Sequence, residues 1–332
     1  MSTNFSDIAS QIKNTLLPEL QSVNEIILDK MQNKVELIPQ IASHIVASGG
    51  KRIRPILTLL SAKLFNYHKD NHHVLLASCI EFIHTATLLH DDVVDENNSR
   101  RGKATSNNIW GNKASVLVGD FLFTKSFELM VQVESLSILE VLSNASSVIA
   151  QGEVMQLANI NNVDITFNDY EEIIFAKTAS LFAAATKVGA MLSGTSKENI
   201  ENIYKYGVNL GIVFQIMDDI LDYSSSELTL GKGIGTDFKE GKITLPILLT
   251  LKECNDSERE FLNKVFSDLN QDDGDFEKVL ELIEKYNIIE KSVEVANSYV
   301  KQGLENLESI DVSNNYKDMF KNLLVSSTIR EN

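Results

Sequence analysis

Apolar residues recur at three- and four-residue spacing along most of this chain, which is the period of amphipathic helices. This pattern predicts helices over residues 74–95, 115–129, 136–157, 170–192, 203–222 and 276–307. Alternating apolar and polar positions, which would predict strands, are scarce. Only four prolines occur in the chain, and few prolines permit long helices because proline interrupts them. The pattern therefore predicts an all-α fold.

Polar or glycine-bearing segments separate the predicted helices, and we expect them to form loops. These segments are residues 47–50, 96–105, 159–168, 224–241 and 270–275. The segment 224–241 is the longest of them, and long loops in compact domains are often functional. No internal repeat or low-complexity tract stands out and no convincing boundary is visible, so we expect one domain over residues 1–332.

The composition excludes several classes of protein. The chain has 332 residues, and its hydrophobic share of 43% is enough for a sizeable core, which excludes wholesale disorder. Acidic residues outnumber basic ones by 46 to 30, so the formal net charge is -16. Non-specific binding to nucleic acid needs a basic surface, and so does electrostatic attachment to acidic lipids. We therefore expect neither partner.

Cysteine usage and the amino-terminal residues bear on the compartment. The two cysteines, Cys79 and Cys254, cannot form a disulfide framework, and they fit a reducing compartment. The first residues lack the charged start and apolar run of a signal peptide. No stretch reaches the roughly 18–20 uncharged apolar residues of a membrane span. We expect a cytoplasmic protein without stable membrane insertion.

Two aspartate clusters occupy matching positions near the ends of two predicted helices. Each follows the pattern Asp-Asp-x-x-Asp, and a polar loop comes directly after it. The first and last aspartates of a cluster are four residues apart, so they share one face of the helix. The six residues are Asp91, Asp92 and Asp95 in the first cluster and Asp218, Asp219 and Asp222 in the second.

Negative charge at these positions is unfavourable and calls for a cation. The carboxyl-terminal end of a helix already carries partial negative charge, and neighbouring carboxylates repel each other. Carboxylate oxygens without a cysteine partner select a hard ion, and Mg²⁺ bridging to a phosphate group is the usual arrangement. The alternative is a pair of solvated helix ends, and the matching spacing of the two clusters argues against it.

Basic residues gather at three places in this acidic chain, as an anion-binding site requires. The first group is Lys51, Arg52 and Arg54, the second is Arg100, Arg101 and Lys103, and the third is Lys232 and Lys242. Arginine forks and lysine point charges both suit the oxygens of a diphosphate. Taken singly, each of these bases is equally explained as a solvated surface residue.

Further polar residues share helix faces with the aspartates. His84 lies seven residues, or about two helical turns, before Asp91. Gln215 precedes the second cluster on the same face, and Lys177-Thr178 interrupts an otherwise apolar helix. A lone histidine on a helix is more often a satisfied core or boundary group. The register of His84 with Asp91 favours a functional position instead.

Taken in order, these motifs resemble the trans-polyprenyl diphosphate synthases. The likeness runs over residues 38–249 and is particularly to the bacterial members that make octaprenyl diphosphate. The motifs that carry it are Gly-Gly-Lys-Arg-Ile-Arg-Pro (49–55), Glu-Phe-Ile-His (81–84), Leu-His-Asp-Asp-Val-Val-Asp (89–95), Arg-Arg-Gly (100–102), Gln-Gly-Glu (151–153), Lys-Thr (177–178), Phe-Gln-Ile-Met-Asp-Asp (214–219) and Gly-Lys (231–232).

The resemblance implies an all-α fold in which long helices surround a deep central cavity, usually in a homodimer, with Mg²⁺ as the cofactor. It implies that the metal is held by Asp91, Asp92, Asp95, Asp218, Asp219 and Asp222. It implies an isopentenyl diphosphate pocket formed by Lys51, Arg54, His84 and Arg101, with a less clear role for Arg52.

The resemblance also implies the contacts of the second substrate, an allylic diphosphate. Its diphosphate would contact Arg100, Lys177, Lys232 and Lys242. The reacting carbons would be lined by Thr178 and Gln215. The expected catalytic residues are accordingly Asp91, Asp92, Asp95, Lys177, Thr178, Gln215, Asp218 and Asp219.

The implied reaction condenses isopentenyl diphosphate successively onto an allylic primer, and farnesyl diphosphate is the expected primer. Breaking the allylic carbon–oxygen bond puts charge on the leaving diphosphate, which metal ions and fixed bases stabilise. The double bond of isopentenyl diphosphate then attacks the allylic cation, and a proton is lost. The cavity must exclude water, because water would trap the cation. The family suggests quinone side chains as the use of the product.

Product length should depend on the room beneath the first aspartate cluster. Ala86 and Thr87, about one turn before Asp91, are small, and in this family large aromatic residues near these positions shorten the product. The helix over 74–95 could wall a tunnel of roughly 30 Å, since a helix rises about 1.5 Å per residue. We therefore expect a long-chain product, octaprenyl diphosphate. Candidate floor residues, which ordinary core packing explains equally well, are Phe123, Phe127 and Met130.

Three other interpretations stay open. A class I terpene cyclase uses similar ionisation, but it usually pairs one aspartate motif with an Asn/Ser/Glu motif. A di-iron helical bundle would use a Glu-x-x-His motif such as residues 81–84, but it normally needs two copies. A non-catalytic helical partner subunit could have lost its aspartate motifs, and here both are intact. A magnesium-dependent turnover assay separates an enzyme from such a partner.

Overall fold

Helices form most of the computed structural model, which describes residues 4–47, 50–224 and 235–329. The amino-terminal helices are α1 (Phe5–Thr15), α2 (Leu17–Met31), α3 (Leu37–Ala47) and α4 (Ile53–Leu64). The central ones are α5 (His72–Val94), α6 (Ser106–Trp110), α7 (Asn112–Gln132), α8 (Leu136–Ala158), α9 (Phe167–Ile174), the π-helical segment η1 (Phe175–Ala179), α10 (Ser180–Ser193) and α11 (Lys197–Ser224). The prediction of an all-α fold is confirmed.

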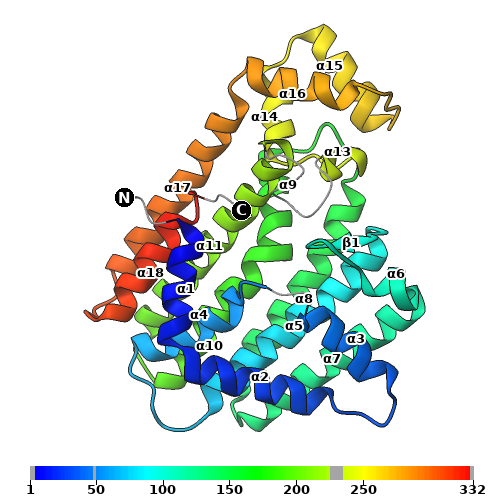
Figure 1. Ribbon diagram of the computed structural model, residues 1–332. Coiled ribbons are helices and arrows are strands. Elements are labelled where there is room, and N and C mark those ends of the chain that lie inside the picture. The colour runs from blue at the N-terminus through cyan, green and yellow to red at the C-terminus, as the bar shows by residue number, and fades with distance from the viewer. Residues whose placement is uncertain (1–3, 48–49, 225–234, 330–332) are drawn as a thin grey trace.

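The carboxyl-terminal part adds shorter helices and one long one. These are α13 (Thr236–Lys239), α14 (Leu245–Glu253), α15 (Asp256–Leu262), the π-helical segment η2 (Asn263–Ser267), α16 (Asp275–Lys285), α17 (Ile288–Glu308) and α18 (Asn315–Ser326). Strands in the described ranges are limited to the antiparallel pair β1 (Ser99–Arg100) and β2 (Lys103–Ala104). In Figure 1 the helices α13 to α16 form the upper end, and α1, α17 and α18 lie along the left side.

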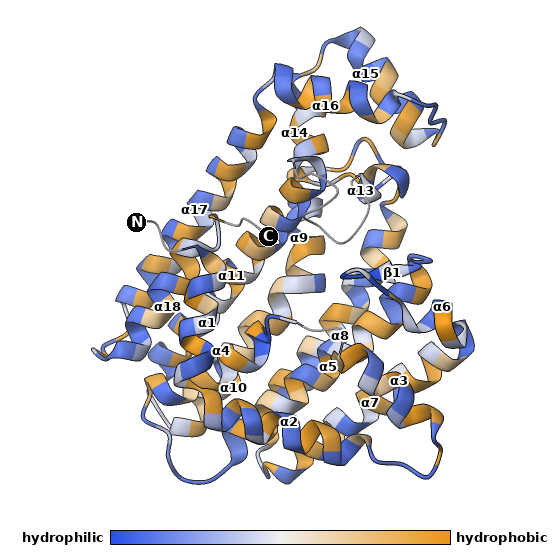
Figure 2. Cartoon of the chain, viewed as in Figure 1, coloured by the Kyte–Doolittle hydropathy of each residue, from blue (hydrophilic) through white to orange (hydrophobic). Residues whose placement is uncertain are grey.

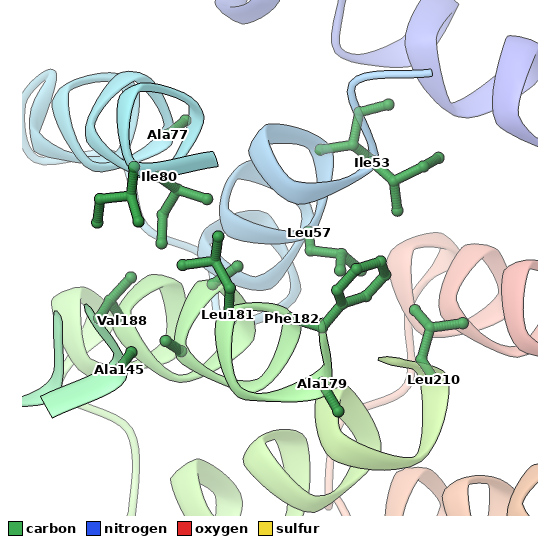
Figure 3. Close-up of a cluster of buried hydrophobic side chains, with 14 of the residues drawn as sticks. Ile53, Leu57, Ala77, Ile80, Ala145, Ala179, Leu181, Phe182, Val188 and Leu210 are labelled. Carbon is green, nitrogen blue, oxygen red and sulfur yellow. The ribbon is translucent and has the colours of Figure 1, made fainter. Parts of the chain in front are cut away.

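Helix α10 forms the centre of the main apolar core. Its residues are apolar on nearly every side, and a helix of this composition is stable only when other helices surround it. It packs against α4, α5, α8 and α11. Figure 3 shows Leu181, Phe182 and Val188 of α10 among apolar side chains from these four helices. Elsewhere apolar and polar segments alternate along the helices, as amphipathic helices require (Figure 2).

A second apolar cluster fills the upper end of the molecule. Phe238 of α13 lies between two other rings, at a centroid distance of 5.4 Å from Phe266 and 5.4 Å from Phe276. Edge-to-face and tilted rings at such distances attract each other beyond the burial of their area. This packing fixes the four-residue helix α13, which lies against the end of α11.

Two helices have the length and composition of a membrane span, but both belong to the core. They are His72–Val94 and the continuous helix Phe167–Ser193. In their most apolar windows, 67% and 83% of the residues are buried inside the protein. Their apolar character is therefore explained by the helices packed around them.

The structure corrects the prediction of a single helix over residues 276–307. The chain forms α16 and α17 instead, separated at Tyr286 and Asn287. Asn287 has a φ of 49°, in the left-handed region that ends helices and that asparagine tolerates. Apolar spacing continues through the break, so the periodicity alone did not reveal it. The segment 224–241 also differs from a pure loop, because α13 lies within it.

Candidate active site

The two aspartate clusters face one cavity of about 730 Å³. The first cluster comes from the carboxyl-terminal end of α5, and the second comes from the last two turns of α11. The predicted site residues that line the cavity are Lys51, Arg54, His84, Thr87, Asp91, Asp95, Arg100, Arg101, Lys177, Thr178, Gln215, Asp218, Asp219, Asp222 and Lys242. Lys232 lies outside the described residues. The fold thus brings together residues that are up to about 190 positions apart in the sequence.

Two of these aspartates, Asp91 and Asp219, have raised pKa values. Burial raises the pKa of Asp91 to about 7, and the nearby carboxylate of Glu153 adds to the effect. Burial also raises the pKa of Asp219 to about 7, against the hydrogen bonds that it accepts. Charged carboxylates in such places are unfavourable unless a cation joins them. Both groups therefore favour a bound cation.

Asp92 has a different environment from the other aspartates of its cluster. It is only 2% exposed and does not line the cavity. Arg100 donates from Nε to both carboxylate oxygens, at 3.0 and 3.2 Å, and from Nη2 to Oδ1 at 2.8 Å. A bidentate pair of this kind fixes both side chains. The structure therefore joins two predicted site residues to each other and ties the hairpin β1–β2 to α5.

Asp95, the last aspartate of the first cluster, is paired across the cavity. Lys242 donates from Nζ to Asp95 Oδ1 at 3.2 Å and lies 2.5 Å from an oxygen of Glu240. These acids raise the pKa of Lys242 even though burial lowers it, so the ammonium stays charged. The pair connects the end of α5 to the segment after α13.

The second cluster is held by a chain of hydrogen bonds. Tyr170 of α9 donates to Asp219 Oδ2 at 2.7 Å, and Gln215 Nε2 donates to Asp219 Oδ1 at 2.8 Å. Thr178 in turn donates to Gln215 Oε1 at 2.7 Å. The chain fixes the amide orientation of Gln215, because its oxygen accepts and its nitrogen donates. Two predicted site residues, Thr178 and Gln215, are thereby placed beside the carboxylate of a third.

Asp222 is anchored by the backbone of α13. The amides of Thr236 and Asp237 donate to its two carboxylate oxygens at 3.3 and 2.9 Å. Burial raises the pKa of Asp237 well above its usual range, and the neighbouring Asp222 and Asp219 contribute. Asp237 therefore adds a fourth carboxylate beside the three aspartates of the second cluster.

Lys177 lies in η1, where the helix widens to a π-turn. Its Nζ donates to Glu153 Oε2 and to Gln156 Oε1, both at 2.7 Å. Single π-turns inside α-helices are frequent at functional sites. Gly152 of α8 permits this contact, because a Cβ there would lie 2.7 Å from the backbone nitrogen of Lys177 and 2.8 Å from Ala176 Cβ. Close packing of α8 on η1 therefore sets the position of the lysine.

Substituting Gly152 by alanine is expected to displace Lys177 and to lower kcat by roughly 10-fold or more, because misplacement by about 1 Å can cost up to about 100-fold. Steady-state assays of the chain elongation that the resemblance implies would measure kcat, and circular dichroism would verify the helical content. Ser143→Ala, at an exposed position of the same helix, is the matched control and should leave kcat unchanged. Full activity of Gly152→Ala would show that the α8–η1 contact does not set the position of Lys177.

The basic end of the cavity contains Arg54 and His84. Burial lowers the pKa of Arg54 to about 10, so it stays protonated at neutral pH. Burial, with Arg54 and Arg101 nearby, lowers the pKa of His84 well below its usual range. Arg54 Nη1 therefore donates to a neutral His84 Nε2, at 3.1 Å. Arg52 forms an ion pair with the buried Glu81, in agreement with a structural role.

The candidate chain-length residues lie along the contact between α5 and α7. Thr87 lines the cavity, whereas Ala86 and Met130 are each 1% exposed and pack in the core. Phe127 is 38% exposed, and its ring lies 5.2 Å from that of the partly buried Phe123. Apart from Thr87, none of these side chains lines the cavity as the structure describes it.

Several residues of the site were given no role by the sequence analysis. They are Glu153, Gln156, Tyr170, Asp237 and Glu240, and all five line the cavity. Glu153 and Gln156 are three residues apart after a glycine, a spacing that places both on one helix face. Tyr170 has no comparable signal, because an aromatic residue at the start of an apolar helix is typical of ordinary core.

Comparison with known proteins gives one consistent result. A family model described as polyprenyl synthetase matches residues 35–283. The octaprenyl diphosphate synthase of Escherichia coli (strain K12) is 49% identical over 238 residues, covering 72% of this chain and 73% of that protein. The octaprenyl diphosphate synthase of Haemophilus influenzae is 37% identical and covers 96% of both chains.

A solved structure matches almost the whole chain. It is a polyprenyl synthase from Caulobacter crescentus CB15, complexed with calcium and isoprenyl diphosphate. The TM-score is 0.93 at 41% identity, covering 97% of this chain and 98% of that one. The likeness therefore extends to the overall arrangement of helices as well as to the motifs.

Proposed function

Because this chain belongs to the polyprenyl synthetase family, it is a trans-polyprenyl diphosphate synthase, and we propose that its product is octaprenyl diphosphate made from farnesyl diphosphate. One observation carries the assignment of substrates to the site. Two acidic clusters and a separate basic end share one cavity, so an allylic diphosphate and isopentenyl diphosphate have distinct places to bind. This arrangement is what a condensation between two diphosphates requires.

We propose Mg²⁺ as the metal and Asp91, Asp95, Asp218, Asp219 and Asp222 as the residues that hold it. Carboxylate oxygens are the donors that this hard ion prefers, and burial raises the pKa of Asp91 and of Asp219, so a bound cation would stabilise their charged forms. Among the described residues no three such side chains converge tightly enough to hold an ion alone. Oxygens of the substrate diphosphate would complete the set. Bound Mg²⁺ would stabilise the charge that develops on the leaving diphosphate.

Asp92 is assigned a supporting role in this proposal. Its two oxygens accept from Arg100, so it orients that arginine toward the allylic diphosphate rather than holding metal. Lys177 and Lys242 supply further positive charge at the same end, and Lys232 is expected to join them. Thr178 and Gln215 would lie beside the reacting carbons, with dipoles that steady a developing cation.

We assign the basic end of the cavity to isopentenyl diphosphate. Lys51, Arg54 and Arg101 are its cations, and the neutral His84 adds a polar contact. A neutral imidazole here cannot repel the neighbouring guanidinium groups, which fits the low pKa of His84. The substrate so placed presents its double bond toward the allylic carbon, and the apolar walls exclude water from the cation.

The length of helix α5 bears on the length of the product. Helix α5 has 23 residues, so it can wall a path of roughly 35 Å at about 1.5 Å per residue. The small side chains of Ala86 and Thr87 leave room next to the cavity. The names of the similar Escherichia coli and Haemophilus influenzae proteins support an octaprenyl product here, and shorter or longer chains are the alternatives.

Replacing Ala86 by phenylalanine is expected to shorten the product by several isoprene units. The side chain is 1% exposed and neighbours Thr87, which lines the cavity, so we expect a ring at this position to block the path of the growing chain. Products would be sized by mass spectrometry. Thr87→Ser, which keeps a small side chain, is the control and should give the wild-type length. An unchanged length in a folded Ala86→Phe variant would refute the tunnel assignment.

We propose a homodimer that associates through α7 and α8. Large apolar side chains on these helices are exposed, including Leu117 at 67%, Val131 at 64% and Leu136 at 84%. Exposed apolar patches of this kind mark interaction sites. A dimer through these helices would also cover the partly exposed Phe127. Sedimentation equilibrium would measure the mass in solution, and a monomer at micromolar concentration would contradict the proposal.

We also propose a cytoplasmic location for the enzyme and a use for its product. The two cysteines are unpaired thiols, and Cys79 is buried, which fits a reducing cytoplasm. An acidic surface argues against nucleic acid as a partner. We propose that the product supplies the side chain of a quinone, since a long polyprenyl group makes such a carrier soluble in the membrane.

The metal requirement tests the proposed function. Purified protein would be incubated with farnesyl diphosphate and isopentenyl diphosphate, and the release of inorganic diphosphate would be followed. Release is expected with Mg²⁺, none with EDTA, and recovery when Mg²⁺ is restored in excess. Release from farnesyl diphosphate alone, with cyclic products, would favour a terpene cyclase. No turnover by folded protein would favour a partner subunit.

A further inference from the structure

We propose that Phe5, on the amino-terminal helix α1, positions Lys51 for isopentenyl diphosphate and so forms part of that substrate's site. This inference rests on the proposed function, because Lys51 is assigned to the pocket there. The ammonium of Lys51 lies 5.2 Å from the centroid of the Phe5 ring. A cation within about 6 Å of a ring centroid is attracted by the negative face of the ring.

The Phe5 ring is itself firmly held. It is 1% exposed and lies 6.5 Å, edge to face, from the ring of Phe214 on α11. Phe214 lines the cavity and lies 5.2 Å from the ring of Phe182 on α10. Phe182 is buried in the main core (Figure 3). The three rings therefore form a row that connects α1 to the centre of the protein.

The same row supports a second cation of the pocket. The guanidinium carbon of Arg54 lies 4.7 Å from the centroid of the Phe182 ring. Lys51 and Arg54 thus stand over the two outer rings of the row, Lys51 just before α4 and Arg54 in its first turn. A ring attracts a cation without cancelling its charge, so the charge stays available to a diphosphate.

A lysine gains particularly from such a support. Its ammonium is a point charge on a flexible four-carbon stem, so binding a diphosphate normally requires the stem to be ordered. A ring that already orders the stem reduces this loss and raises affinity. The consequence for the fold is that Phe5, the first residue of α1 and far from Lys51 in the sequence, belongs to the substrate site.

Phe5→Leu tests the proposal, because leucine keeps the apolar packing and removes the ring. We expect the KM for isopentenyl diphosphate to rise about 2- to 5-fold, the range given by a partly exposed cation–π contact. The kcat and the KM for farnesyl diphosphate should change less than about 2-fold. Phe320→Leu is the control. Its ring is equally buried but lies over neither Lys51 nor Arg54, so both KM values should stay unchanged.

A double-mutant cycle with Lys51→Met shows whether the ring acts through the lysine. In the Lys51→Met background, Phe5→Leu should have no further effect on the KM for isopentenyl diphosphate. An equal rise in both backgrounds would overturn the proposal, and so would an unchanged KM in Phe5→Leu. If the leucine variant unfolds early in a thermal scan, Phe5→Met takes its place, because the flexible methionine side chain fills irregular gaps in a core. Failure of the wild type to elongate any primer would instead refute the proposed function.

Discussion

Replacing Asp91 by alanine is expected to lower the rate of elongation by about 1000-fold or more. Asp91 lies in the last turn of α5 and lines the cavity, where its carboxylate faces the place assigned to the allylic diphosphate. Removing one preorganised electrostatic group from a reacting centre typically costs about 100- to 1000-fold. Loss of a metal ligand should cost at least as much, because the leaving diphosphate would lose part of its charge stabilisation. Single-turnover assays at saturating substrate would measure the rate.

Although Asp91→Ala should lose activity, it should not lose stability. Burial raises the pKa of Asp91, which means that its charged form is unfavourable in the metal-free protein. Asp91→Ala should therefore unfold at the same temperature as the wild type or higher when no metal is present. Asp29→Ala, with a side chain 77% exposed on α2, is the control and should affect neither property. A fully active Asp91→Ala enzyme would remove the first aspartate cluster from the metal site.

The Mg²⁺ concentration that gives half-maximal rate is expected to rise about 100-fold between pH 8 and pH 6. Asp91 and Asp219 each have a pKa of about 7, and both must lose a proton before they can hold a cation. Roughly nine tenths of each group is ionised at pH 8 and roughly one tenth at pH 6. Because both carboxylates must be ionised to hold the cation, the two roughly tenfold effects multiply. Mg²⁺ titrations of the elongation rate would measure this dependence, after subtraction of Mg²⁺ binding to free diphosphate in the same buffers.

The same shifts determine how pH affects the metal-free protein. An unfolded aspartate has a pKa near 3.9, so between about pH 4 and 7 the folded protein binds more protons than the unfolded chain. Its free energy of unfolding must then fall as the pH rises through this window. Adding Mg²⁺ with inorganic diphosphate should raise the free energy of unfolding above pH 7 and have little effect on it at pH 5.5. Equal stabilisation at both values would contradict the raised pKa values.

Helical periodicity predicted the central helices closely because those helices are bounded by polar loops. The predicted range 136–157 corresponds to α8 (Leu136–Ala158), and the range 203–222 lies within α11, which begins six residues earlier at Lys197. Periodicity could not reveal the break at Asn287, because apolar spacing continues through it. It also could not reveal η1, since a π-turn adds one residue without changing which residues are apolar. That extra residue lies beside Lys177, where the site depends on it.

The sequence predicted most of the charged residues of the site, but it did not predict the aromatic residues that support them. The aspartate clusters were visible because like charges at helix ends need a partner. The pairing of Asp92 with Arg100 was not, since the spacing of the cluster treats its three aspartates alike. Tyr170 and Phe5 look like core residues in the sequence. Only the fold shows that one donates to Asp219 and that the other lies under Lys51.

The most direct test of the function is the size of the product. Purified wild-type protein would be incubated with farnesyl diphosphate, excess isopentenyl diphosphate and Mg²⁺, and the products would be sized by mass spectrometry. A forty-carbon diphosphate as the final product is expected. A shorter or longer final product would keep the enzyme class and contradict the assignment of the tunnel. No elongation of several allylic primers by demonstrably folded protein would contradict the proposed function itself.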